Sequence, residues 1–176
     1  SGAVAAGCTT ASTCTVTMSA DRTVVATFIQ TFTLTVSTSG GGANTVTSGD
    51  GYISCGATCS KVYDAASPAT SAVLTANPAT GYRLVSWSGG GCSGSGSTCT
   101  VSMSEARTVT ATFVQTFVLT AAKSGSGGGT LASDAGGIDC GSTCTATFDL
   151  ASPATQVTLT ATADSGSRFT GWSGAD

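Results

Sequence analysis

The sequence predicts an all-β protein in which small modules follow one another along the chain, joined end to end by near-continuous strands. Two observations support this prediction. Apolar residues alternate with Thr and Ser over long stretches, which is the period of a strand with one buried face. The chain also repeats itself at an interval of 85 residues, and a fixed internal interval indicates a tandem architecture. No stretch shows the 3.6-residue spacing of an amphipathic helix.

The repeat can be followed residue by residue. Residues 31–87 and 116–172 are identical at 27 of 57 positions without a gap, and residues 12–30 match 97–115 at 14 of 19 positions. These matches divide the chain into three parts: the C-terminal part of a preceding repeat (1–30), a complete repeat (31–115) and the N-terminal part of a following repeat (116–176).

Strands are expected wherever the alternation runs, and turns where Gly, Asn, Asp and Pro gather. Over residues 99–121, which cross the junction at Gln115, the apolar residues that share one strand face are odd-numbered: Val101, Met103, Val109, Ala111, Phe113, Phe117 and Leu119. Their counterparts over residues 14–36 are even-numbered: Val16, Met18, Val24, Ala26, Phe28, Phe32, Leu34 and Val36. Turns are expected at residues 18–23, 37–44, 48–51 and 76–82.

The junctions between repeats contain no linker. Around Gln30 ("TFIQTF") and Gln115 ("TFVQTF") the alternation keeps its phase, and neither glycine nor proline interrupts it. Flexible tethers are rich in Gly and Ser. We therefore expect the last strand of one repeat to run into the first strand of the next, so that consecutive repeats form a stiff rod.

Eight cysteines lie in closely spaced pairs. Hydrophobic residues make up 40% of the chain but aromatic residues only 6%, so each module has a thin core that needs covalent support. Cysteine spacing alone leaves the connectivity open. We predict local disulfides, because the N-terminal part carries one pair without the other pair of its own repeat. Zinc and a redox-active dithiol are the alternatives, but the spacing is not C-x2-C and no His is present. The predicted pairs are Cys8–Cys14, Cys55–Cys59, Cys92–Cys99 and Cys140–Cys144.

Two recurring residue types are candidate ligand contacts. Trp87 and Trp172 are interpreted as core residues, with sugar stacking as the alternative. Arg83 and Arg168 are interpreted as covering apolar surface or bonding turn carbonyls, with ligand contact as the alternative. The equivalent acids Asp64 and Asp149 are interpreted as turn caps.

Composition argues against several other classes of function. The chain has no His and no recurring pair of carboxylates, so we expect no catalytic residues and no enzyme activity. It lacks the acidic clusters of calcium repeats, and we expect neither a metal nor a cofactor. With a net charge of −3 and no basic stripe we expect no nucleic-acid partner. The chain contains no run of about 18 apolar residues, so we expect no membrane span.

One string carries a family resemblance. Residues 81–113, "GYRLVSWSGGGCSGSGSTCTVSMSEARTVTATF", resemble the divergent, cysteine-containing group of bacterial InlB B-repeat-like modules, as do "YISCGATC" (52–59) and "GIDCGSTC" (137–144). The resemblance implies small β-sandwich-like or β-grasp-like units, in tandem in secreted and cell-surface proteins, that serve as stalk or spacer. It supplies no catalytic residues. The sequence departs from the pattern in the longer loop between Ser1 and Cys8.

Two functions are compatible with these features. The first is a structural building unit of an extracellular bacterial stalk or filament, and the second is an adhesin-type repeat that binds glycans or surfaces. A buried Trp87 would favour the first and an exposed one the second. The expected partners are copies of the chain arranged head to tail, either as a covalent array or by strand exchange. Because both ends fall at the same phase of the repeat, we expect residues 1–30 of one copy to complete the module begun by residues 116–176 of the preceding copy.

Overall fold

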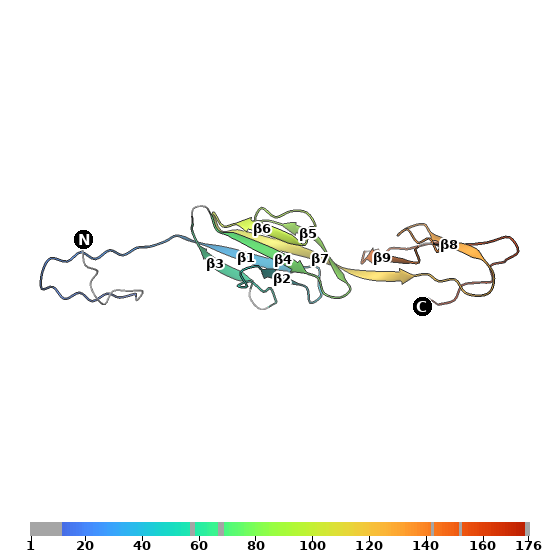
Figure 1. Ribbon diagram of the computed structural model, residues 1–176, viewed down its shortest axis with the longest axis horizontal. Coiled ribbons are helices and arrows are strands. Elements are labelled where there is room, and N and C mark those ends of the chain that lie inside the picture. Colours follow the sequence, from blue (N-terminus) through green and yellow to red (C-terminus); the bar gives the residue numbers. More distant parts are fainter. Residues whose placement is uncertain (1–11, 57–58, 67–68, 142, 152, 175–176) are drawn as a thin grey trace.

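The computed structural model describes residues 12–56, 59–66, 69–141, 143–151 and 153–174, and these residues form strands, turns and loops without a helix (Figure 1). None of them forms a helix that could span a membrane. The strands are β1 (Thr31–Ser39), β2 (Thr45–Ser48), β3 (Ser60–Asp64), β4 (Ser71–Asn77), β5 (Tyr82–Ser88), β6 (Thr98–Ser102), β7 (Arg107–Thr120), β8 (Gly129–Ser133), β9 (Thr145–Asp149) and β10 (Leu159–Ala163).

A two-layered sandwich occupies the first part of the fold, from β1 to the middle of β7, and is called the first unit below. One layer has the strand order β3-β1-β7-β5 and the other has the order β2-β4-β6. All neighbours are antiparallel except β1 and β7, which run parallel from the pair Leu34–Arg107 to the pair Ser39–Thr112. The all-β prediction is confirmed, in its sandwich form.

The core of the first unit lies between the two layers and follows the predicted alternation. Val101, Met103, Val109 and Ala111 are fully buried, and Phe113 nearly so. Leu34 and Val36 of β1, Val46 of β2 and Leu74 of β4 close the core from their own strands. Burying one such large apolar side chain contributes about 1.5–3 kcal/mol. The odd-numbered face of β7 is therefore the main wall of this core.

The outer face of the same layer is polar. The hydroxyl groups of Ser37 and Thr110 lie 2.9 Å apart across β1 and β7. Two residues further along, Ser39 donates a hydrogen bond to Thr112 at 3.1 Å. Such pairs between facing residues stabilise the pairing of neighbouring strands.

Strand β7 passes without interruption through the predicted junction at Gln115. Its fourteen residues close the first unit and then, from Thr116, pair with β9 as the first strand of the second unit. The expected strand continuity at Gln115 is thus confirmed. At Gln30 the outcome differs, because β1 begins at Thr31 and residues 12–30 contain no strand.

The absence of strands in residues 12–30 corrects the expectation from the alternation. A lone strand has no partner for its backbone hydrogen bonds and is not stable in water. Figure 1 shows this segment extending away from the first unit, at the opposite end of the molecule from β8 and β9. The alternation is present, but no neighbouring strand lies beside it.

The second unit contains counterparts of only some of the first unit's strands. Beyond the shared strand β7 it has β9, which pairs with β7, and a separate pair formed by β8 and β10. Its buried cluster is small and consists of Ala121, Leu131, Ile138, Cys140 and Ala146. Residues 167–173, which match β5 in sequence, form no strand. In the first unit β5 is held by β7, and no equivalent of that contact exists among the described residues of the second unit.

A polar cluster distinguishes the two units. In the first, Asp50 accepts hydrogen bonds from the hydroxyl groups of Ser48 and Tyr63, the latter at 2.7 Å. Burial acts to raise the pKa of Asp50, but these hydrogen bonds and one from the Tyr52 amide outweigh it and hold the pKa below its ordinary value. Burial, together with the bond to Asp50, raises the pKa of Tyr63. The second unit has Ala135 and Phe148 at the equivalent positions, so carboxylate and hydroxyl are lost together.

One glycine is required by close packing. Gly40 has φ +97°, and a Cβ there would collide with the carbonyl oxygen of Phe113. Gly125 is its counterpart in the second unit; it has φ +93° and nothing within 4 Å of such a Cβ. Both positions favour glycine through their left-handed backbone, but only Gly40 has a strand against it.

We expect Gly40→Ala to destabilise the protein more than its matched control, Gly125→Ala. Each change costs about 1–2 kcal/mol for the left-handed backbone. The collision with β7 should add about 1–3 kcal/mol at Gly40 alone. Urea unfolding of both variants measures the difference, and equal losses would show that the contact with Phe113 has no energetic weight.

A double-mutant cycle tests the Asp50–Tyr63 pair. Asp50→Ala and Tyr63→Phe should each destabilise the first unit, because each leaves one polar group without its partner. The double variant, which restores the combination found in the second unit, should recover about 1 kcal/mol relative to the sum of the single changes. Additive losses in urea unfolding would contradict this coupling.

Candidate functional site: the joint between the units and an open cavity

Three of the predicted disulfides are present: Cys55–Cys59, Cys92–Cys99 and Cys140–Cys144. The fourth predicted pair, Cys8–Cys14, includes Cys8, which lies outside the described residues. Closing loops of this length contributes about 2–2.5 kcal/mol each in the chain-entropy estimate. The cysteines therefore act as local staples, and within the described residues no group of His, Cys, Asp and Glu could hold a metal ion.

The disulfide between Cys55 and Cys59 fastens the two layers of the first unit. The Cys55 amide donates to the carbonyl of Val46 in β2 at 2.8 Å, and the Val36 amide of β1 donates to the carbonyl of Cys59 at 2.7 Å. The second unit repeats the arrangement. The Cys140 amide donates to the carbonyl of Leu131 in β8, and the Ala121 amide, directly after β7, donates to the carbonyl of Cys144. Each staple therefore joins strands that belong to different layers.

Trp87 is a core residue, as interpreted from the sequence. Its side chain is 3% exposed, and its indole Nε1 donates to the carbonyl oxygen of Gly96 at 2.7 Å. The loop closed by Cys92–Cys99 lies over it and accepts a second bond, from the Trp87 amide to Gly94. A ring held in this way cannot stack on a sugar.

Trp172 differs from its counterpart and corrects the expectation that both tryptophans are core residues. It is 55% exposed and packs against Phe169, with the ring centroids 5.1 Å apart. Among the described residues no strand pairs with residues 167–173, whereas in the first unit β7 pairs with β5 beside Trp87. Without that neighbouring strand the Trp172 side chain stays exposed.

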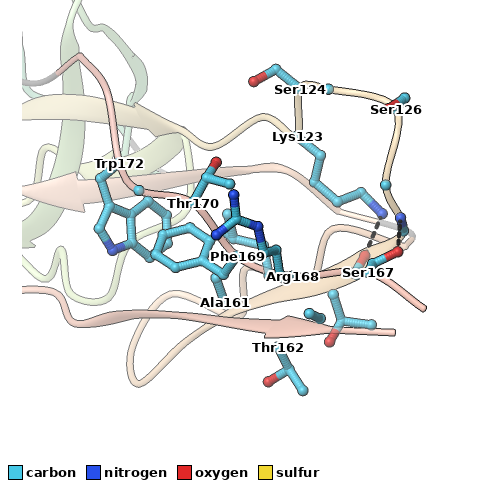
Figure 2. Close-up of a pocket in the computed structure, with 18 of the residues that line it drawn as sticks. Lys123, Ser124, Ser126, Ala161, Thr162, Ser167, Arg168, Phe169, Thr170 and Trp172 are labelled. Atoms are coloured by element: carbon cyan, nitrogen blue, oxygen red, sulfur yellow. Dashed lines mark hydrogen bonds between the residues drawn. The ribbon is translucent and has the colours of Figure 1, made fainter. Parts of the chain in front are cut away.

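Both aromatic residues border an open cavity of about 500 Å³ in the second unit. It is lined by residues 122–131, 161–163 and 166–173. Figure 2 shows Lys123, Arg168, Phe169 and Trp172 among the residues that line this cavity. Two hydrogen bonds close its end, from Lys123 to the Gly129 carbonyl at 3.0 Å and from the Gly128 amide to Ser167 at 2.9 Å.

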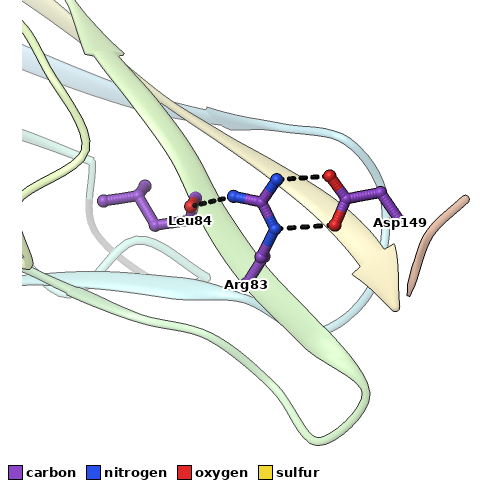
Figure 3. A network of polar contacts seen from close by, with 3 residues as sticks. All are labelled: Arg83, Leu84 and Asp149. Atoms are coloured by element: carbon purple, nitrogen blue, oxygen red, sulfur yellow. Dashed lines mark hydrogen bonds and ion pairs between the residues drawn. The ribbon is translucent and has the colours of Figure 1, made fainter. Parts of the chain in front are cut away.

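The joint between the units is held by an ion pair. Arg83 of β5 and Asp149 of β9, 66 residues apart, meet in a two-pronged contact in which Arg83 Nε donates to Asp149 Oδ1 at 2.6 Å and Nη2 donates to Oδ2. Arg83 Nη1 also donates to the carbonyl of Leu84 at 3.2 Å. Figure 3 shows the guanidinium and the carboxylate face to face. This geometry orients both partners, unlike a contact between point charges.

The ion pair reaches across β7 from one edge to the other. The Thr116 amide donates to the Gly81 carbonyl just before β5, and the Leu150 amide just after β9 donates to the Gln115 carbonyl. The C=O and N–H of one trans peptide point in opposite directions, so β5 and β9 lie on opposite edges of β7. Arg83 faces Val114 and Asp149 faces Thr116, and side chains two residues apart share a face. The pair therefore forms a strap over the outer face of β7 at the joint.

Charge and hydrogen bonding reinforce one another in this strap. The hydrogen bonds from Arg83 lower the pKa of Asp149, and the bond from Asp149 raises the pKa of Arg83. Both side chains are partly exposed, at 50% and 39%, so water and salt screen the attraction. We therefore assign the strap to fixing the angle between the units and not to the stability of either unit.

The strap was not found by sequence reasoning, and it corrects the interpretation of Asp149 as a turn cap. The available signal was the repetition of both residue types: the arginine at position 83 recurs at 168, and the aspartate at position 64 recurs at 149. Pairing an arginine with an acid of the following repeat requires knowing which strands flank β7. Within the described residues neither Arg168 nor Asp64 has an ion-pair partner.

Strands shared between sandwiches, local disulfides and a strapped joint define a class, the tandem-repeat β proteins. The divergent InlB B-repeat domain matches residues 32–117 and again residues 119–176. The chain belongs to this family, and the two adjacent matches are consistent with tandem repeats. Comparison with curated proteins and with solved structures found no match.

We expect Asp149→Ala to loosen the joint and Asp64→Ala, its matched control, to leave the joint unchanged. Small-angle scattering and NMR relaxation of the two units measure the mobility. The pKa of Asp149 is lowered in the fold, so the strap is complete above about pH 4, the ordinary aspartate value, and is lost as the pH falls through the folded pKa.

An NMR titration checks the cause of that shift. In Arg83→Ala the pKa of Asp149 should rise relative to the wild type, whereas Arg168→Ala should leave it unchanged. The strap has no role at the joint if Arg83→Ala and Arg168→Ala both leave the pKa of Asp149 unchanged. The same conclusion follows if the two units are no more mobile in Asp149→Ala than in Asp64→Ala.

Proposed function

We propose that this chain is a structural building unit of an extracellular bacterial stalk or filament, made of tandem disulfide-stapled β-repeats and without enzyme activity. The observation that carries the proposal is β7, a single strand of fourteen residues that belongs to two consecutive units. A spacer must transmit position along its length. A shared strand does so because no flexible residue separates the units.

The other features fit a load-bearing role outside the cell. The disulfides are local and each ties strands together within its own unit, which suits an oxidising compartment. The strap between Arg83 and Asp149 limits rotation about the shared strand. The family membership supports a repeat used in series.

An adhesin-type role is the second candidate, and one observation favours it. Phe169 and Trp172 form an exposed aromatic pair beside Arg168 at the cavity of the second unit (Figure 2), and such a surface can stack on a sugar. The first unit argues against this role, because the equivalent Trp87 is buried there. Glycan binding by the full chain that is lost in Trp172→Ala, but not in Tyr52→Ala (also an exposed aromatic residue), would favour the adhesin.

Stiffness of the joint is the test of the structural proposal. Replacing Gln115-Thr116 by a four-residue Gly/Ser linker should turn the arrangement of the two units from one preferred geometry into a broad distribution, because Gly/Ser segments behave as flexible chains. Small-angle scattering of both proteins measures the change. The control inserts the same four Gly/Ser residues after Glu105, in the exposed loop between β6 and β7 of the first unit, and should leave the scattering of the joint as in the wild type.

A wild-type chain that scatters as two freely moving units would contradict the proposal. So would turnover of polysaccharide or peptide substrates by the purified chain.

A further inference from the structure

The first and last strands of the first unit lie side by side and run parallel. The chain enters this unit at Thr31, where β1 begins, and leaves it along β7 through Gln115. The two strands pair with each other over six residues of each strand. Because they run in the same direction, the entry and exit points of the chain lie at opposite ends of the pair, as Figure 1 shows.

This geometry decides how tension along the chain acts on the first unit. A pull on the chain from both sides of the unit slides β1 lengthwise past β7. The hydrogen bonds of a parallel pair are evenly spaced along the strands, so such a slide loads all of them at once. If entry and exit lay at the same end of the pair, the same pull would break the bonds one after another. Rupture of all the bonds together requires the larger force.

Side-chain contacts on both faces of the pair oppose the same slide. On the core face, Val36 of β1 lies directly opposite Val109 of β7, and both side chains are buried. On the outer face, the hydroxyl groups of Ser37 and Thr110 lie 2.9 Å apart across the two strands. A slide of one residue would set core side chains of one strand against outer side chains of the other. The pair is therefore held in its register by the backbone and by both faces.

The disulfides of the first unit do not relieve the pair of this load. Cys55–Cys59 and Cys92–Cys99 each close a short loop, and none of these cysteines belongs to β1 or β7. Tension between the entry and exit points therefore acts on non-covalent contacts between the two strands. Once these contacts break, the disulfides leave most of the unit free to extend.

We propose that the parallel pair of β1 and β7 is a mechanical clamp, that is, the contact that keeps the first unit folded when the chain is pulled along its length. This inference deepens the proposed structural function, on which the use of the clamp outside the cell rests. It adds resistance to tension within a unit to stiffness between units. Strand β7 passes through the joint without a break, so tension from the second unit reaches the clamp along the axis of that strand.

Single-molecule force spectroscopy of the full chain tests the clamp through the direction of pulling. Handles attached to azide-bearing side chains introduced at Gln30 and Val118, both exposed, pull β1 and β7 in opposite directions along their axes. Moving the second handle to Ala106, directly before β7, puts both handles at the same end of the pair, which is then peeled apart. At one pulling speed the first arrangement should need at least about twofold more force to unfold the unit, because its evenly spaced bonds break together.

Two buried valines separate the clamp from the general stability of the unit. Val109→Ala truncates the side chain opposite Val36 in the clamp, and Val46→Ala makes the same change in β2 of the other layer; both valines are fully buried. Each variant should lower the free energy of unfolding in urea, because each leaves a gap in the core. Forced unfolding reports the barrier to unfolding. Only Val109→Ala should therefore lower the unfolding force when the handles are at residues 30 and 118.

Two outcomes would overturn the inference. The first is an equal unfolding force for the two pulling arrangements, which needs no destabilised variant. The second is an unfolding force that is the same in Val46→Ala as in Val109→Ala. Either result would place the resistance to tension elsewhere in the unit. Neither bears on the stiffness of the joint at Gln115, which scattering measures without load, so the clamp and the structural function fail separately.

Discussion

The structure depends on the unbroken two-residue period of β7. A strand turns successive side chains to opposite faces, so the odd-numbered residues that close the first core, such as Phe113, and those that open the second, such as Leu119, point to the same side. Every other element is placed relative to this strand. The parallel partner β1 and, after the joint, β9 lie on one of its edges, and β5 lies on the other. A glycine or an extra residue at Gln115 would interrupt the alternation of β7. The strands on either side of the joint would then lose their fixed arrangement, even if both cores stayed well packed.

The two kinds of cross-connection have separate roles. Disulfides act within a unit, where the thin core leaves the two layers in need of a covalent tie. The Arg83–Asp149 ion pair acts between units, where a covalent tie would have to bridge different repeats. Exposed ion pairs contribute little to stability, but a two-pronged contact is specific in angle. The shared strand sets the axis along which the units follow one another, and the strap connects the two strands that flank this axis at the joint.

Much of this arrangement could be predicted from the sequence, because it follows from local patterns. The alternation identified the buried face of β7, and the absence of a linker around Gln115 indicated the continuous strand. The N-terminal part carries one cysteine pair without the other pair of its repeat, which indicated local disulfides, and three of them are observed. What escaped prediction depends on long-range pairing. The parallel contact between β1 and β7 and the meeting of Arg83 with Asp149 both require knowing which strands are neighbours, and period alone does not contain that information. Residues 12–30 show the converse, since their alternation is clear but they form no strand without a neighbour. Trp172 was expected to be buried because it matches Trp87 in the repeat. It is exposed because, among the described residues, no strand lies beside it.

The odd length of the repeat has a geometric consequence. Successive repeats place their core residues at opposite parities of the numbering, even in β1 and odd in the continuation of β7, yet the shared strand keeps both cores on one side of itself. Each unit is therefore reached from the last by a shift along the strand and its twist, without a half-turn. A series built in this way has two chemically different flanks: one formed by the sandwiches, the other by the Ser and Thr pairs of β1 and β7 and the straps at the joints. Anything that recognised only one flank would meet it again at every repeat.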